Sequence, residues 1–260
     1  KILLLHIGAF YLNFDSRRKT LWQKLTSRIR LVCVLLMVLA IALTPNGHWW
    51  TWSIYAISIC IVVLISKVNL VILLKRLAIE SAFLGTLLIG NLFHDGREIL
   101  WQWGWFKVST EGLIILGSVG CKTILSLILL NVLTLTTSIP SLLQALISLK
   151  TPPLLVAILA SMYRYIGVLI EESNSMKRAA ISRNLLNNKR WQRLVLGNAI
   201  GGLFVRTYDR GERVYLAMLS RGYRGLPPTP KASKTKKHDL VALFLTVLVA
   251  LLGQAVYLKK

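Results

Sequence analysis

Residues 112–133 read GLIILGSVGCKTILSLILLNVL, and Lys122 carries the one charge in this run. A helix needs about 18 or more largely apolar residues to cross a hydrocarbon core roughly 30 Å thick. Backbone amides and carbonyls inside that core must be paired within the chain, which a single segment achieves as a helix. The run therefore predicts a transmembrane helix, with Lys122 either snorkelling to the interface or facing other helices or a partner subunit.

The composition of the whole chain also indicates a membrane protein. Its 260 residues are 55% hydrophobic and carry a formal net charge of +22. A soluble domain with this apolar content would mix charges of both signs over its surface, whereas here basic residues gather between long, almost uncharged stretches. Cys33, Cys60 and Cys121 all fall in apolar stretches, so no disulfide framework is indicated.

Further apolar segments predict four more spans, over residues 29–44, 49–65, 77–93 and 239–258. Turn residues at 45–48 join the first two of these spans, and tryptophans at the start of the second form an aromatic belt. The connection at 94–111 has few positive charges and three tryptophans, which places it on the outer side of the membrane.

Basic residues gather between the fourth and fifth spans, where residues 134–238 hold about half of the 32 lysines and arginines. The positive-inside rule places this segment in the cytoplasm, and the basic first 28 residues are expected at the cytoplasmic interface. The sequence thus predicts an all-α membrane protein with about five transmembrane helices and a cytoplasmic block before the last. Its divisions are the N-terminal segment 1–28, the membrane domain 29–133, the block 134–238 and the final span 239–260.

Helix boundaries are clear inside the 134–238 block. Ser138 is expected to cap a helix with proline in its first turn, and Thr151-Pro152-Pro153 begins a longer helix. The longer helix has one apolar face and a charged opposite side that includes Glu171 and Glu172, so it should lie on a surface or a partner.

A second basic helix is expected from Gly202 to Arg221. Its arginines recur at helical spacing and share about one face: Arg206, Arg210, Arg213 and Arg221. An Asp209–Arg213 pair would contribute only a few tenths of a kcal/mol, so helix stability alone does not explain this face. Glycine at 222 ends the helix and leaves Arg221 in the last turn, where its planar fork suits a carboxylate on a partner. For the charges of the longer helix, including Glu171 and Glu172, a solvated charged face over a local core is the alternative interpretation.

Several segments together resemble the transmembrane T component of energy-coupling factor transporters, the EcfT/CbiQ family, and in particular its cobalt- and nickel-type members. The resemblance covers nearly the whole chain and rests on 44–50, 136–143, Met162–Tyr165 with Glu171-Glu172, and Leu203–Gly225. It implies a non-catalytic subunit of an ATP-driven importer. Such a subunit spans a prokaryotic inner or plasma membrane several times, with the N-terminus and the coupling helices in the cytoplasm.

In that family each coupling helix ends in an Ala-Arg-Gly-like motif whose arginine docks on an ATPase subunit. The resemblance places these motifs at Ser182-Arg183-Asn184 and Ser220-Arg221-Gly222, with Arg206, Arg210 and Arg213 as a supporting basic face. Both motifs depart from the pattern at their first position, and the first also has asparagine in place of glycine. Asparagine tolerates a left-handed backbone better than most residues, so Asn184 is still expected to close its helix.

The resemblance also implies partners. It implies two ABC-type ATPase subunits, identical or different, and a CbiM-like membrane S component that binds the cobalt or nickel ion, and it allows a small accessory membrane subunit. ATP and Mg²⁺ would bind the ATPase subunits, so we expect no cofactor and no metal on this chain. Its four histidines are dispersed without ligand spacing. Residues 117–123 fail as a phosphate loop, because Gly120 and Lys122 are not adjacent.

Two other function classes stay open on the residues alone. Dense lysine and arginine could bind nucleic acid or anionic lipid, although a block tethered between spans and lacking a nucleic-acid module argues against nucleic acid. A secondary transporter would show inverted repeats and broken polar helices near the midplane, and neither pattern is clear in this sequence.

Overall fold

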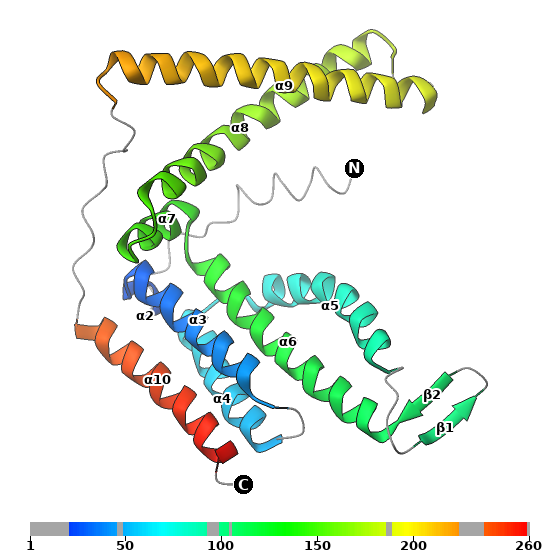
Figure 1. The fold of residues 1–260 in the computed structure, drawn as a ribbon, viewed down its shortest axis with the longest axis vertical. Helices are drawn as coiled ribbons and strands as arrows, with labels where there is room; N and C mark the ends of the chain where they lie inside the picture. Colours follow the sequence, from blue (N-terminus) through cyan, green and yellow to red (C-terminus); the bar gives the residue numbers. More distant parts are fainter. Residues whose placement is uncertain are drawn as a thin grey trace. The chain divides into compact units, whose positions relative to one another are not determined.

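The computed structural model describes residues 21–45, 49–92, 99–103, 106–185, 189–223 and 237–258. Within these ranges the chain forms nine helices and a two-stranded hairpin (Figure 1). It divides into two compact units. The first comprises Lys1–Ala145 with Ser233–Lys260, and the second comprises Leu146–Ala232. Residues 1–20 of the expected N-terminal interfacial segment, residues 46–48 of the expected turn and residues 94–98 of the expected outer connection lie outside the described residues.

The first unit holds the helices that occupy the five predicted spans. They are α3 (Ser27–Leu43), α4 (Trp49–Ser66), α5 (Leu70–Leu92), α6 (Thr110–Thr136) and α10 (Lys237–Leu258), preceded by the short α2 (Leu21–Lys24). The last helix packs against α3 and α4, and α6 packs against α3, α4 and α5 (Figure 1). The predicted helical membrane architecture is therefore confirmed.

The core of this unit lies where α3, α4 and α6 meet. Its fully buried side chains include Tyr55, Ile41 and Leu129. The last helix approaches closely at Gly253, because a Cβ there would lie 2.8 Å from Cε1 of Tyr55, nearer than real Cβ contacts come. Gln254 Nε2 donates to the carbonyl oxygen of Ala40 at 3.2 Å, so α10 is joined to α3 by a polar contact beside this close approach.

The third span begins earlier than the sequence predicts. Helix α5 starts at Leu70, so Lys75 and Arg76 lie inside the helix, whereas the expected start at residue 77 treated them as a boundary. Both side chains are good helix formers, and their charge limits only how deep they lie in a bilayer. Arg76 Nη1 donates to Thr134 Oγ1 of α6 at 3.3 Å, so a hydrogen bond joins this charged turn of α5 to α6.

The connection after α5 contains strands, which the all-α prediction did not include. Strands β1 (Ile99–Trp103) and β2 (Phe106–Ser109) pair antiparallel, with Trp103 opposite Phe106 and Ile99 opposite Ser109. Aromatic and β-branched residues favour strands, and here they flank a two-residue connection. Trp101 and Trp103, which sequence analysis used only to place this connection on the outer side, therefore also lie in a β-strand.

The second unit consists mainly of two long helices, α8 (Pro153–Ser182) and α9 (Lys189–Ser220), entered through α7 (Ile139–Ser148). Ser138 caps α7 as predicted, because the Ser141 amide donates to its Oγ at 3.4 Å. The longer helix α8 follows Pro152, also as predicted. Helix α9 begins at Lys189 and not near Gly202, since its glycines cost about 1 kcal/mol each without stopping the helix.

Three described helical segments are long and apolar enough to cross a membrane, Ile115–Thr136, Pro153–Ser182 and His238–Ala255. The first and last lie in predicted spans. The second is α8, which sequence analysis assigns to the cytoplasmic block because basic residues gather in that block and because one side of the helix is charged. That assignment stays a prediction.

Candidate coupling site at two helix ends

Helix α8 ends in a Schellman motif centred on Arg183. The Asn184 amide donates to the Ile181 carbonyl at 2.9 Å, and the Leu185 amide donates to the Ala180 carbonyl at 3.0 Å. Asn184 has a φ of 52°, the left-handed conformation that this motif requires at the position after the cap. The predicted closure of the helix by asparagine is confirmed.

Helix α9 ends in the same way at Arg221. The Gly222 amide donates to the Leu219 carbonyl at 2.9 Å, and the Tyr223 amide donates to the Met218 carbonyl at 3.0 Å. Gly222 has a φ of 79° and supplies the left-handed residue without steric cost. Both arginines thus occupy the cap position itself, one residue before the left-handed turn.

The serines that depart from the family pattern are also equivalent. Ser182 Oγ donates to the Ala179 carbonyl at 3.0 Å, and Ser220 Oγ donates to the Ala217 carbonyl at 2.9 Å. Each hydroxyl therefore satisfies its hydrogen bond within its own helix, three residues back. A serine in place of alanine leaves the geometry of both helix ends intact.

A third helix end has this geometry without arginine. In α7 the Lys150 amide donates to the Ile147 carbonyl at 3.0 Å and the Thr151 amide donates to the Leu146 carbonyl at 3.3 Å, while Lys150 has a φ of 61°. Its cap position is Leu149, where the other two ends carry arginine. The Schellman geometry is therefore common to the three helices, and the guanidinium group is what distinguishes the ends of α8 and α9.

Both arginine side chains are exposed, as are the serines beside them. The hydrogen bonds of the Schellman motif hold the backbone of each cap residue in one conformation. The arginine side chain therefore extends from a rigid helix end. Together the two ends present two rigidly based guanidinium groups, each with donors for a bidentate pair with a carboxylate.

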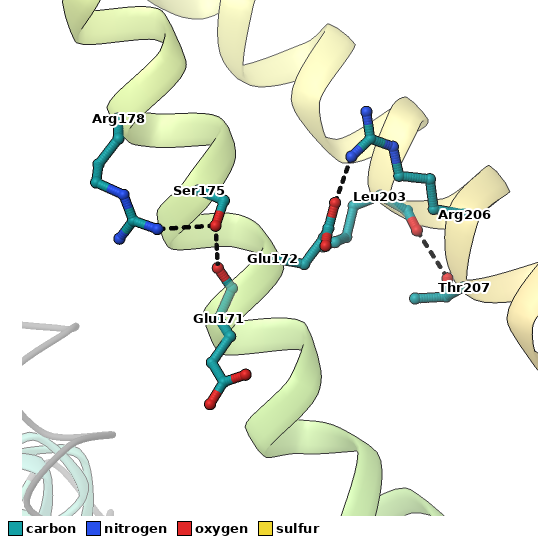
Figure 2. Close-up of polar contacts among 7 residues, drawn as sticks. All are labelled: Glu171, Glu172, Ser175, Arg178, Leu203, Arg206 and Thr207. Atoms are coloured by element: carbon teal, nitrogen blue, oxygen red, sulfur yellow. Dashed lines mark hydrogen bonds and ion pairs between the residues drawn. The ribbon is translucent and has the colours of Figure 1, made fainter.

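The two helices of this unit are joined by an ion pair that sequence analysis did not predict. Figure 2 shows Glu172 of α8 pointing toward Arg206 of α9, and the carboxylate accepts a hydrogen bond from Arg206 Nη1. The Arg206 side chain is 65% exposed, so the pair adds little stability by itself. Sequence analysis noted the Glu171-Glu172 pair, but spacing within one helix cannot identify a partner 34 residues away.

The predicted basic face is therefore divided. Arg206, one of the three arginines of the expected supporting basic face, forms an ion pair with Glu172. Arg210 and Arg213 are exposed and line a shallow hollow with Asp209 between the same helices. The charge that remains for an outside partner is centred on Arg210 and Arg213, on the same helix as the Arg221 end.

An apolar groove of about 500 Å³ lies beside this face, between the N-terminal half of α8 and the C-terminal part of α9. It is lined mainly by aliphatic and aromatic side chains, including Leu154, Ile158, Met162, Ile166 and Tyr223. Several of these side chains are more than two-fifths exposed. Apolar surface of this extent indicates a unit that is covered by a partner or a membrane when it works.

Metal-ligating groups do not gather in the part of the chain that the structure describes. No cluster of three or more His, Cys, Asp or Glu side chains there could hold a metal ion. The exposed guanidinium groups at the α8 and α9 ends suit binding of acidic groups.

Comparison with known proteins assigns the family. The model of the CbiQ family, described as cobalt transport protein, matches residues 18–232. The energy-coupling factor transporter transmembrane protein EcfT of Macrococcus caseolyticus is 28% identical over 250 residues, which cover 92% of this chain and 94% of that protein. The EcfT of Bacillus subtilis is 29% identical over 248 residues, covering 90% and 93%.

A third relative is named as a fused protein. The protein of Methanocorpusculum labreanum provisionally named fused cobalt transport protein CbiMQ is 30% identical over 128 residues, covering 48% of this chain and 21% of that protein. The family model spans most of this chain, and the EcfT relatives align along nearly their whole length. This chain therefore belongs to the CbiQ/EcfT family and is the non-catalytic, multi-pass transmembrane component of an energy-coupling factor transporter.

Proposed function

We propose that the chain carries the motion of two ATPase subunits to a separate substrate-binding membrane subunit, and that Arg183 and Arg221 are its two attachment points. The observation that supports this most is the equivalence of the two ends: each arginine caps its helix, precedes a left-handed residue and is exposed. Two matched attachment points suit two ATPase subunits, one for each arginine.

The two helices are suited to act as levers. A helix of the length of α8, 30 residues, reaches about 45 Å at 1.5 Å per residue. A carboxylate-bound arginine at its end would displace the whole rod as the ATPase subunits close on ATP and reopen. Helices α8 and α9 pack against each other, with the Glu172–Arg206 pair as one polar contact between them, so movement of one helix would be passed to the other. ATP and Mg²⁺ would be held by the ATPase subunits and not by this chain.

Cobalt or nickel is the proposed cargo, bound on the S component. The matching family is described as cobalt transport protein, and the CbiMQ relative carries the same description. The fusion in that relative supports a CbiM-like subunit as the membrane partner here. The N-terminus and residues 134–238 would face the cytoplasm, because about half of the lysines and arginines lie in that block.

Transport assays of alanine variants test this function. Arg183→Ala, Arg221→Ala and the double variant are assembled with the ATPase and S subunits in proteoliposomes, and cobalt or nickel uptake is measured with ATP hydrolysis. We expect each single variant to lower uptake about tenfold or more, because a buried charge-assisted pair contributes roughly 2–5 kcal/mol. Arg193→Ala is the control, since Arg193 is an exposed arginine in the first turns of α9 and does not cap either helix. Wild-type uptake by a correctly inserted double variant would refute the proposal.

A further inference from the structure

Arg30 is a buried arginine in the first turns of α3, and its side chain is only 8% exposed. Its Nη1 donates to the backbone carbonyl of Thr136 at 2.8 Å and to Thr137 Oγ1 at 3.0 Å. Thr136 is the last residue of α6, so its carbonyl has no partner within that helix. The guanidinium therefore closes the C-terminal end of α6, where a positive charge is also favoured by the helix dipole.

The same helix end receives a second donor. Trp22 Nε1 donates to Thr136 Oγ1 at 3.1 Å, and Trp22 is 7% exposed. Thr136 and Thr137 are themselves buried. Side chains from α2 and α3 thus hold both residues at which α6 ends and the chain leaves for α7.

Asp239 makes a second contact with the start of α3, at the point where the chain re-enters the first unit after the second. It is fully buried in the first turn of α10, and its Oδ1 accepts a hydrogen bond from the Thr26 amide at 2.9 Å. Thr26 caps α3, one turn before Arg30, and the Arg30 amide donates to the Thr26 carbonyl at 3.1 Å. One turn of α3 therefore contacts the end of α6 through a cation and the start of α10 through a carboxylate.

The contacts at Thr137 and at Asp239 lie at the two points where the chain passes between the first and the second unit. Residues 146–232 form the second unit, and the chain enters this unit through α7 after Thr137 and leaves it before Asp239. Both covalent connections of the second unit are therefore anchored on the first turn of α3, by groups that lie wholly in the first unit.

We propose that Arg30 and Asp239 form a polar clamp that fixes both connections of the coupling unit to the membrane helices, so that motion of α8 and α9 is passed on to the bundle. The inference rests on the proposed coupling function. An apolar contact of equal area would resist separation but permit sliding, whereas hydrogen bonds to a backbone carbonyl and a backbone amide fix register and direction. Arg30 is a positioning residue in this scheme, since it is buried and its hydrogen bonds go to groups of this chain.

The test is the coupling ratio of the assembled transporter. Arg30→Met keeps much of the volume of the side chain and removes its donors, and Arg28→Met is the matched control, because Arg28 lies two residues away on the same helix and is exposed. Both are reconstituted with the ATPase and S subunits, and ions taken up per ATP hydrolysed are measured per assembled complex. We expect Arg30→Met to retain ATP hydrolysis and to lower this ratio about tenfold, within the usual range of coupling free energies.

Two further variants separate a clamp from a merely structural role. Arg30→Lys keeps the charge and restores a donor, so we expect it to recover part of the ratio. Thr137→Val removes one acceptor with little change in volume, and a severalfold loss is expected. The clamp is refuted if Arg30→Met has the ratio of Arg28→Met, or if uptake and ATP hydrolysis fall in equal proportion in Arg30→Met and Thr137→Val.

The outcomes also distinguish the clamp from the coupling proposal on which it rests. Normal uptake by the Arg183→Ala, Arg221→Ala double variant would remove the coupling function itself. A transport defect in that double variant together with a wild-type ratio in Arg30→Met would leave the function standing and refute the clamp alone.

Discussion

Two residues with a left-handed backbone decide where the coupling arginines are placed. Asn184 and Gly222 have φ values of 52° and 79°, and each directly follows an arginine. The left-handed conformation costs most L-residues about 1–2 kcal/mol, whereas glycine adopts it freely and asparagine adopts it more readily than most. The two helix ends are therefore similar in geometry, but the left-handed turn is more stable at Gly222 than at Asn184.

Substitution of Gly222 should loosen the end of α9. Among the residues that the structure describes, no atom lies within 4 Å of the position that a Cβ would take at Gly222, so the cost of Gly222→Ala is that of the backbone, about 1–2 kcal/mol. We expect the Gly222 and Tyr223 amides to exchange their hydrogens roughly five to thirty times faster, measured by hydrogen–deuterium exchange on the intact protein. Asn184→Gly is the opposite change and should slow exchange at residues 184 and 185. Equal exchange in wild type and Gly222→Ala would contradict this.

Gly253 is restricted by space instead of by backbone conformation. A side chain there would overlap the buried ring of Tyr55, so Gly253→Ala must displace α10 or the ring. We expect a destabilisation of about 1–3 kcal/mol, as overpacking usually gives, and a lower midpoint of thermal unfolding in detergent. Gly85→Ala is the control, because no atom lies within 4 Å of its Cβ position. A midpoint for Gly253→Ala at or above that of Gly85→Ala would show that the two helices do not approach there.

Single residues also show how far sequence reasoning reaches. The Asn184 turn was predictable, because backbone preference is a local property of a residue type. The Glu172–Arg206 pair and the anchoring of Thr136 by Arg30 were not, since they join residues 34 and 106 positions apart. A buried arginine in an apolar helix is detectable in the sequence, but its acceptor is fixed by packing.

At the scale of helices, periodicity predicted which helices exist better than where they begin. Helix α5 starts at Leu70 and α9 at Lys189, both earlier than expected. The basic pair before residue 77 marks a membrane boundary without weakening a helix, so α5 continues through it. The glycine pair before α9's expected start costs about 1 kcal/mol per glycine, which the rest of a long helix offsets. Proline and the left-handed caps gave correct boundaries at Pro153 and at Arg183.

The charged face of α9 should steer an acidic partner through its unpaired arginines. We expect Arg213→Ala to lower the association rate of the ATPase subunits severalfold at low salt, and the effect should vanish near 1 M salt, where the screening length is about 3 Å. The Glu172→Ala, Arg206→Ala double variant leaves the net charge unchanged and should associate at nearly the wild-type rate. Stopped-flow binding to the protein in nanodiscs measures both. A salt-independent loss in Arg213→Ala would instead indicate a direct contact.

At the scale of the whole molecule, the order of spans and the inserted block were predictable, and the packing was not. Hydropathy and the positive-inside rule follow from composition along the chain. The packing of α10 against α3 joins the two ends of the sequence, through Gln254 and Ala40, and no local pattern specifies it. The hairpin at Ile99–Ser109 was also missed, because apolar residues in a short segment suit a strand and an interface equally.

Topology can be measured with single cysteines. In a variant whose Cys33, Cys60 and Cys121 are replaced by alanine, Arg193→Cys should react with a membrane-impermeant maleimide only in inside-out vesicles. Trp50→Cys, exposed at the start of α4, should react only from the outer side of intact cells. The reason is the excess of basic residues in the 134–238 block. Labelling of residue 193 in intact cells would reverse the proposed orientation.

The central claim is that two helix-end arginines hold the ATPase subunits. The affinity of these subunits for the protein in nanodiscs tests it directly, with Arg183→Ala, Arg221→Ala, the double variant and Arg193→Ala compared. We predict that each single variant at a helix end weakens binding by about thirtyfold or more, corresponding to roughly 2 kcal/mol, and that the double variant forms no stable complex. Arg193→Ala should bind like wild type, and wild-type affinity in the double variant would contradict the claim.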